Sequence, residues 1–204
     1  MKTPSRPLVI GLYAPRPQSG KSTIADMIEA HTHVARLKVS GAMKAMTAAL
    51  LRETGLDEDT IARHIDGDLK DAPIPGLTDD AGGPITSRDI QKTLGKEWGR
   101  TLFGARFWTR PLRAAIEAST APVVLIDDVR FPADHAIVCA FGGINVRIVR
   151  PLGAAEIDDH GSEGLLERHA FDVDLVNDGS LADLRGNVDR LLLPRLPLRD
   201  RLAS

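Results

Sequence analysis

The stretch Leu8–Thr23 constrains the fold of this chain more than any other. Apolar residues Leu8–Ile10 lead through a turn rich in Gly and Pro to Gly20–Thr23, and apolar side chains then recur at helical spacing from Ile24. This pattern predicts a strand, a loop and a helix. In such an arrangement the N–H groups of the loop and of the first helical turn point at one spot, where they stabilise phosphate oxygens. The sequence therefore predicts a phosphate-binding loop.

Two side chains in this loop suit a nucleotide. Lys21 would place a positive charge on the β- and γ-phosphates, and the Ser22 hydroxyl would hold Mg²⁺. The strict pattern G-x-x-x-x-G-K-[ST] has glycine where this chain has Pro15, so the loop departs from the pattern at its first position. The alternative is a glycine-rich turn before an ordinary helix. The apolar strand and the amphipathic helix on either side favour phosphate binding.

Composition narrows the class of protein. A chain of 204 residues, 43% hydrophobic and 26% charged, can bury the core of one domain with a small inserted subdomain. The net charge of -2 and the pI near 6.3 argue against duplex DNA as the main partner. The single cysteine, Cys139, lies in the apolar run AIVCAF, so we expect a buried thiol in a reducing compartment. No apolar leader or membrane-length run is present, so we expect a cytoplasmic protein with no membrane partner. A homodimer is left open.

Five segments separated by predicted helices read as strands, near 8–13, 34–39, 122–127, 144–149 and 172–176. This alternation predicts an α/β fold with a parallel sheet between two helical layers. The third strand has the apolar run Val123–Ile126 and ends in Asp127 and Asp128. The carboxyl ends of parallel strands line the ligand crevice, so these acids should lie beside the phosphate loop, as in a Walker B element.

The long segment between the second and third strands should be mostly helical. It contains a predicted helix at 42–54, a helix capped by Asp57, a mobile surface loop from Asp71 to Pro84, and a helix that starts at a Thr86–Asp89 capping box. The last of these helices is basic, which indicates either a solvated surface or a second anion site. Further on, the apolar stripe of Trp108, Leu112 and Ile116 predicts core packing.

Three features are expected in the C-terminal part of the chain. Pro132–Phe141 should form a helix closed by two glycines, and Ser180–Asp183 should form a capping box for the last helix. The polar segment between 154 and 169 suggests a helical lid over the site.

Several segments are similar, in the same order, to those of the phage-type deoxynucleoside monophosphate kinases. They are APRPQSGKST, MKAMTAALL followed by IDGDLKDAPIPGL, SRDIQKTLGKEWGR, IDDVRFP, HGSE and FDVDLVNDGSL, and they span nearly the whole chain. The resemblance implies a three-layer P-loop kinase fold with a five-stranded parallel sheet. It further implies a core formed by 1–41 and 120–204, a helical acceptor-binding insertion at 42–119 and a small lid at about 154–169. The implied reaction is ATP-dependent phosphorylation of a deoxynucleoside monophosphate to the diphosphate, with Mg²⁺ as cofactor.

The same resemblance suggests roles for individual residues. ATP would bind at Ser19, Gly20, Lys21, Ser22 and Thr23, and Asp128 would hold the metal together with Ser22. The segments that shape the acceptor side contain Lys44, Arg88, Gln91, Trp98 and Arg100, with core packing as the favoured role of the Trp98 ring. We hypothesise that Arg130 and Arg150 stabilise the transferring phosphoryl group beside Lys21, and that a lid carrying His160 and Glu163 closes over it.

Three alternatives remain. A P-loop kinase that acts on a hydroxymethylated base in DNA would bind DNA in a salt-sensitive way, which the acidic pI disfavours. Another small-molecule kinase, such as a dephospho-coenzyme A kinase, would not be expected to share the GKEWGR and DVRFP segments. A regulatory ATPase would bind or hydrolyse ATP without stimulation by a monophosphate.

Overall fold

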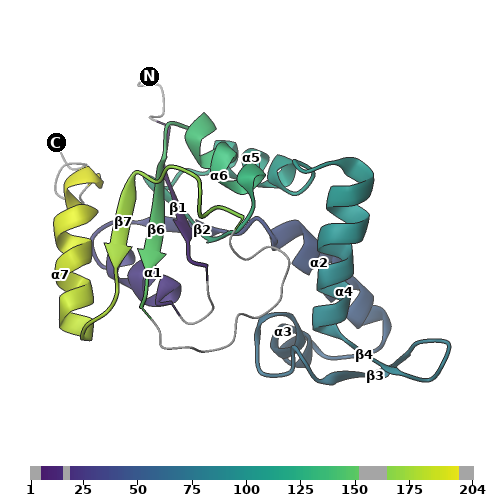
Figure 1. Cartoon of the computed structure of the whole chain (residues 1–204). Coiled ribbons are helices and arrows are strands. Elements are labelled where there is room, and N and C mark those ends of the chain that lie inside the picture. The colour runs from purple at the N-terminus through teal and green to yellow at the C-terminus, as the bar shows by residue number, and fades with distance from the viewer. Residues whose placement is uncertain (1–5, 16–18, 152–164, 198–204) are drawn as a thin grey trace. The chain divides into compact units, whose positions relative to one another are not determined.

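The computed structural model describes residues 6–15, 19–151 and 165–197 of the chain (Figure 1). The chain divides into two compact units. The first contains Met1–Val39 and Leu112–Ser204, and the second contains Ser40–Pro111. In the described ranges, no helix has both the length and the apolar character that a membrane span requires.

The first unit is built on a five-stranded sheet with the strand order β2-β5-β1-β6-β7, and every neighbouring pair is parallel. The strands are β1 (Leu8–Tyr13), β2 (Val34–Leu37), β5 (Val123–Val129), β6 (Ile144–Val149) and β7 (Val173–Val176). All four residues of the apolar run in β5, from Val123 to Ile126, are fully buried, as expected of a strand covered on both faces. The predicted α/β fold with a five-stranded parallel sheet is confirmed.

Helices cover both faces of this sheet. The helices α1 (Lys21–Glu29) and α7 (Leu181–Leu191) pack on the face that carries Ile10 and Leu12, and together they form the main core. Gly11 points to the opposite face, where a Cβ atom would lie 2.7 Å from Val138 of α6 (Pro132–Ala140). Glycine is therefore required at position 11 for α6 to pack closely against β1. The chain ends its described part with a short 3-10 turn, η2 (Leu193–Arg195).

The predicted helix caps at three positions are confirmed. The Asp57 carboxylate accepts the backbone N–H of Thr60 and caps α3 (Glu58–Asp66), and this hydrogen bond lowers the pKa of Asp57. Capping boxes start α4 (Ser87–Thr93) at Thr86 and α7 at Ser180. Each cap satisfies N–H groups that the helix itself leaves without a partner.

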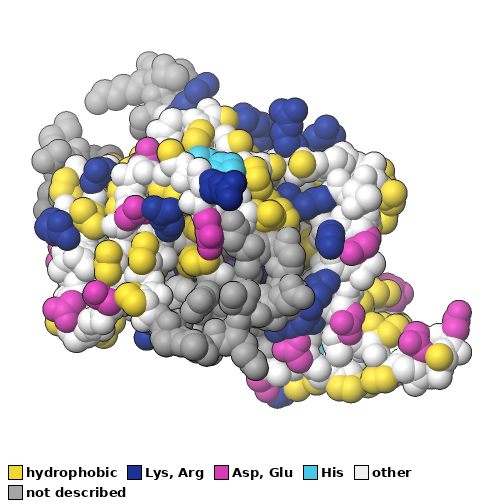
Figure 2. All heavy atoms as spheres, in the orientation of Figure 1, with side chains coloured by type: hydrophobic (Ala, Val, Ile, Leu, Met, Phe, Trp, Pro, Cys, Tyr) yellow, Lys and Arg dark blue, Asp and Glu magenta, His cyan; other side chains and the backbone are white. Residues whose placement is uncertain are grey.

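The second unit contains α2 (Gly41–Glu53), α3, β3 (Pro73–Thr78), β4 (Pro84–Thr86), α4 and the π-helix η1 (Leu94–Leu102). The segment from Asp71 to Pro84, predicted to be a loop, contains instead the β3 strand of an antiparallel hairpin. Ile74 anchors the hairpin in a small core with Leu51 and Ile61. The tight turn forms because Asp79 accepts backbone N–H bonds from Ala81 and Gly83. Acidic side chains are visible at the hairpin tip (Figure 2).

A π-helix replaces the second half of the helix predicted to start at Thr86. It follows α4 directly, and its Gly95 carbonyl accepts a hydrogen bond of 3.0 Å from the Trp108 indole. Trp108 itself is buried, as are Leu112 and Ile116 on α5 (Thr109–Ala118), so the predicted apolar stripe is confirmed.

The prediction of a buried thiol is wrong, because Cys139 is exposed. Ile137 and Val138 occupy the buried face of α6, and the next residue lies about 100° further round the helix. The Cys139 sulfur lies 3.7 Å from Nδ1 of His135 and accepts a hydrogen bond of 3.3 Å from the Asn145 amide. The apolar sequence around Cys139 therefore did not indicate its exposure.

Candidate phosphate-binding site

The loop between β1 and α1 starts at the carboxyl end of the central strand, which has β5 on one side and β6 on the other. Ala14, Pro15, Ser19 and Gly20 are its described residues, and 16–18 lie outside the described part. Ser19 is only 3% exposed. Its carbonyl accepts a hydrogen bond of 3.0 Å from the side-chain amide of Asn177. The end of the loop is therefore held against the body of the unit.

Gly20 forms the junction between loop and helix. Its φ of 93° is left-handed, and a Cβ atom would lie 2.7 Å from Nδ2 of Asn177, so only glycine fits without strain. Lys21 is the first residue of α1, Ser22 is exposed and Thr23 is half-buried. The first turn of α1 contains no acidic residue. N–H groups at this end have no helical partner, so the helix N-terminus favours an anion.

Two acids lie at the carboxyl end of β5, beside the end of β1. The register runs from Gly11 opposite Ile126 to Tyr13 opposite Val129, so β5 carries one extra residue around Asp127 and Asp128. Such a bulge re-aims side chains at the end of a strand. One oxygen of Asp128 accepts the backbone N–H of Val39 at 2.8 Å. Both acids are half-buried, and the choice between them as a metal ligand stays a prediction.

Two of the predicted arginines lie at the same edge of the sheet. Arg130 directly follows β5 and Arg150 directly follows β6, and both are exposed. The Arg130 backbone is fixed, because its N–H donates to Asp134 at 3.1 Å. Because β1, β5 and β6 are parallel, their carboxyl ends lie at the same edge of the sheet. The phosphate loop, Arg130 and Arg150 follow these three ends. His160 and Glu163, predicted in the lid, lie outside the described residues.

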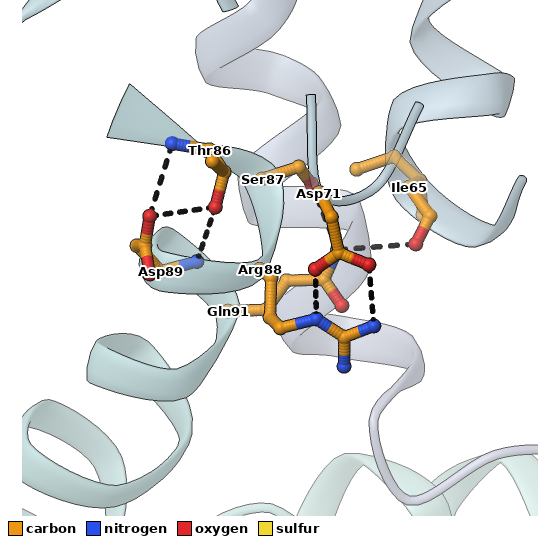
Figure 3. A network of polar contacts seen from close by, with 7 residues as sticks. All are labelled: Ile65, Asp71, Thr86, Ser87, Arg88, Asp89 and Gln91. Atoms are coloured by element: carbon orange, nitrogen blue, oxygen red, sulfur yellow. Dashed lines mark hydrogen bonds and ion pairs between the residues drawn. The ribbon is translucent and has the colours of Figure 1, made fainter. Parts of the chain in front are cut away.

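The basic residues predicted for the acceptor side lie in the second unit and contact acids there. Lys44 on α2 forms an ion pair with Asp66. Arg88 forms a two-pronged ion pair with Asp71, with 2.8 Å between Nη2 and Oδ2 (Figure 3). The hydrogen bonds from Arg88 lower the pKa of Asp71. Lysine and arginine side chains are visible along the surface over α4 and η1 (Figure 2).

Gln91, Trp98 and Arg100 make contacts that stabilise the unit itself. Gln91 is buried, and its amide donates to the Ile65 carbonyl and to Ser87, at 3.1 and 2.9 Å (Figure 3). Trp98 packs in a cluster of rings with Phe103, Phe107 and Trp108. Arg100 donates to the Ala105 carbonyl at 2.9 Å. The Trp98 side chain is half-buried in this cluster, and the choice between core packing and contact with an acceptor stays a prediction.

Within the ranges 6–15, 19–151 and 165–197, no group of three or more His, Cys, Asp or Glu side chains could hold a metal ion. The hydroxyl of Ser22 and the carboxylate of Asp128 are oxygen donors, the type that Mg²⁺ prefers. Mg²⁺ at a nucleotide site uses one or two protein ligands together with phosphate oxygens and water. These two residues therefore fit the ion that the sequence predicts.

Asn177 is a residue of this site to which the sequence analysis gave no role. It directly follows β7, is 9% exposed and contacts both Ser19 and Gly20. An Asn-Asp-Gly sequence normally indicates a turn, and here it connects β7 to the capping box at Ser180. Only the fold shows that the amide of Asn177 reaches the phosphate loop.

Comparison with known proteins gave matches at the level of structure. No protein-family model matches the chain, and no curated protein matches its sequence. The crystal structure of TT1252 from Thermus thermophilus is 17% identical, with a TM-score of 0.47 over 93% of this chain and 98% of that chain. A mutant of the APS kinase CysC from Mycobacterium tuberculosis is 15% identical, with a TM-score of 0.39 over 93% and 99% of the two chains. An unliganded sugar kinase from Janibacter sp. HTCC2649 is 13% identical, with a TM-score of 0.37 over 91% and 94%. At these values the likenesses assign neither an activity nor a substrate to this chain.

Proposed function

We propose that the protein is an ATP-dependent kinase that phosphorylates a deoxynucleoside monophosphate to the diphosphate. The observation that carries the proposal is the left-handed Gly20 at the start of α1. The loop that contains it follows the central strand β1 of a parallel sheet, and the acids at the end of β5 lie beside the end of that strand. This is the arrangement that binds and activates a nucleoside triphosphate. The choice of acceptor rests on the sequence resemblance.

In the proposed reaction, the protein holds two nucleotides in line and neutralises charge on the moving phosphoryl group. Lys21 and the N–H groups at the start of α1 bind the β- and γ-phosphates of ATP. Ser22 and Asp128 would hold Mg²⁺, which would neutralise part of the negative charge on the phosphates. Arg130 stabilises the transferring group. The monophosphate oxygen attacks the γ-phosphorus, the bond to the bridging oxygen breaks, and ADP leaves.

The second unit is proposed to bind the monophosphate. Its basic residues, Lys44, Arg88 and Arg100, already contact groups of their own unit. An acceptor phosphate would share or replace these partners. Arg88 suits this role best, because its guanidinium is held by two parallel bonds to Asp71 and a guanidinium can bind carboxylate and phosphate in the same forked way.

Substitution of Lys21 tests the proposal. In Lys21→Ala, phosphoryl transfer from ATP should be lost while the urea midpoint stays within error of the wild type. Arg185→Ala is the matched control, because it removes an exposed positive charge from the same unit, on α7. Retained turnover in the Lys21 variant would refute the phosphate-binding role.

The acceptor is tested by a panel of deoxynucleoside and nucleoside monophosphates, with an oligonucleotide containing hydroxymethyluracil as the contrasting substrate. Turnover that depends on one or a few free deoxynucleoside monophosphates supports the proposal. Phosphate transfer only to the oligonucleotide would indicate a kinase that modifies DNA. ATP hydrolysis that no acceptor stimulates would indicate a regulatory ATPase.

A further inference from the structure

Asn177 joins two parts of the chain that are 158 positions apart. Its backbone N–H donates to the Val149 carbonyl at 2.8 Å, which fixes it at the end of β7. Its side-chain Nδ2 donates to the Ser19 carbonyl at 3.0 Å. A Cβ atom at position 20 would lie only 2.7 Å from the same nitrogen. A carbonyl oxygen only accepts hydrogen bonds, so the nitrogen of the amide must face the loop.

This hydrogen bond fixes the direction of a loop N–H group. The Ser19 carbonyl and the Gly20 N–H belong to one peptide unit, and no cis peptide bond occurs in the part of the chain that the structure describes. In a trans peptide these two groups point in opposite directions. Because the Ser19 carbonyl points at Asn177, the Gly20 N–H points away from Asn177.

We propose that Asn177 is a positioning residue that aims the Gly20 N–H at the phosphate chain of the nucleotide. The inference rests on the proposed nucleotide-binding function of the loop. Asn177 acts through the peptide between Ser19 and Gly20 and does not itself contact the ligand. Loss of Asn177 would remove this restraint on the peptide, and a rotated peptide would withdraw one phosphate donor without altering Lys21.

The same strand end offers a matched control. Asn187 on α7 donates from its side-chain amide to the Val176 carbonyl at 2.9 Å, so it holds the residue next to Asn177 with the same chemistry. It has no hydrogen bond to the loop in the described structure. A role limited to the stability of the segment after β7 would therefore make Asn177 and Asn187 equivalent.

The experiment uses the full chain with Asn177→Leu, which keeps a similar volume without a donor, and Asn177→Ala as a second variant. Binding of ATP and of tripolyphosphate is measured by calorimetry with Mg²⁺, beside thermal unfolding and the KM for the monophosphate. Loss of the donor should weaken the binding of ATP and of tripolyphosphate by about tenfold, which is the effect of losing one well-placed hydrogen bond. The KM for the monophosphate should stay unchanged. Asn187→Ala should lower the unfolding temperature but leave both affinities within about twofold of the wild type.

Four outcomes decide the question. Weaker tripolyphosphate binding in the Asn177 variants alone supports the inference. Equal weakening in Asn187→Ala, or unchanged binding in both Asn177 variants, overturns it and leaves the proposed kinase activity standing. A wild-type protein that phosphorylates no acceptor but binds tripolyphosphate in an Asn177-dependent way supports the inference and refutes the kinase. A wild-type protein that binds neither ligand refutes both.

Discussion

A substitution in the π-helix of the second unit tests how tightly the aromatic cluster specifies this structure. Gly99 is buried beneath Trp108, and a methyl group there would overlap the indole ring, touching Nε1 and lying 2.5 Å from Cε2 and 2.7 Å from Cζ2. The ring cannot move away freely. It is 3% exposed, packs edge-on against Phe107, and donates its N–H to the Gly95 carbonyl. Gly99→Ala should therefore destabilise the unit.

The size of the effect follows from three contributions. Overpacking of a well-filled core costs about 1–3 kcal/mol. Displacement of the indole loses its hydrogen bond to Gly95, which costs about 1 kcal/mol. Alanine is the better helix former, and this returns about 1 kcal/mol. The net loss of unfolding free energy for Gly99→Ala is about 1–3 kcal/mol, the sum of these terms.

Gly95→Ala is the matched control in the same helix. A methyl group at Gly95 would meet only Met43, at 3.1 Å from its sulfur, and a thioether can shift because its chain is flexible. Alanine then contributes part or all of its higher helix propensity. The free energy of unfolding of this variant should equal that of the wild type or exceed it by up to about 1 kcal/mol. Gly95→Ala should therefore be more stable than Gly99→Ala, although the two glycines are only four positions apart.

Urea unfolding followed by tryptophan fluorescence measures both variants. The chain has 2 tryptophans, Trp98 and Trp108, and both belong to this ring cluster, so the signal reports the second unit directly. The midpoint of Gly99→Ala should fall by about 1 M, given a typical urea slope of about 2 kcal/mol per M. Equal midpoints for Gly99→Ala and Gly95→Ala would refute the packing of Trp108 on Gly99.

Three further predictions follow from single side chains. Arg130→Ala should lower kcat by about 10³-fold or more if Arg130 stabilises the transferring group, whereas Arg113→Ala, on an exposed part of α5, should leave kcat within a few-fold. The hydrogen bonds from Arg147 lower the pKa of Asp174, so the stabilising effect of this carboxylate is present above about pH 4 and is lost as pH falls through its lowered pKa. Asp174→Asn should therefore lower the urea midpoint at pH 7, with a difference from wild type that closes as the pH falls through the lowered pKa of Asp174. Cys139 should react with a thiol reagent in one equivalent without denaturant, and protection until unfolding would contradict its exposure.

Local rules were sufficient for the sheet and for the helix starts. The apolar run Val123–Ile126 has few alternatives to a buried strand, because it is continuous, β-branched at most positions and bounded by turn formers. The caps at Asp57, Thr86 and Ser180 could be predicted since each satisfies backbone groups within four residues of itself. Such signals need no knowledge of the tertiary structure.

Features that depend on distant partners could not be predicted in this way. The hairpin at β3 and β4 forms because Ile74 has a core to enter, which its own turn-rich sequence does not indicate. The π-helix is accompanied by the contact between Trp108 and Gly95, 13 positions away. The exposure of Cys139 depends on which face of α6 the sheet covers, and the apolar residues on both sides of it conceal that face.

The departure at Pro15 can be understood in the same terms. The strict phosphate-loop pattern describes only contributions that the loop makes to its own shape, namely glycines that permit a left-handed or crowded backbone. In this chain the exit of the loop is also fixed from outside, because Asn177 holds the Ser19 carbonyl and Gly20 has the left-handed φ that turns the chain into α1. The first turn of α1, whose N–H groups have no helical partner, starts at this exit. A motif search weighs Pro15 and Gly20 alike, whereas the structure places the stricter backbone requirement on Gly20, because its φ of 93° and the nearby Asn177 amide leave no room for a side chain.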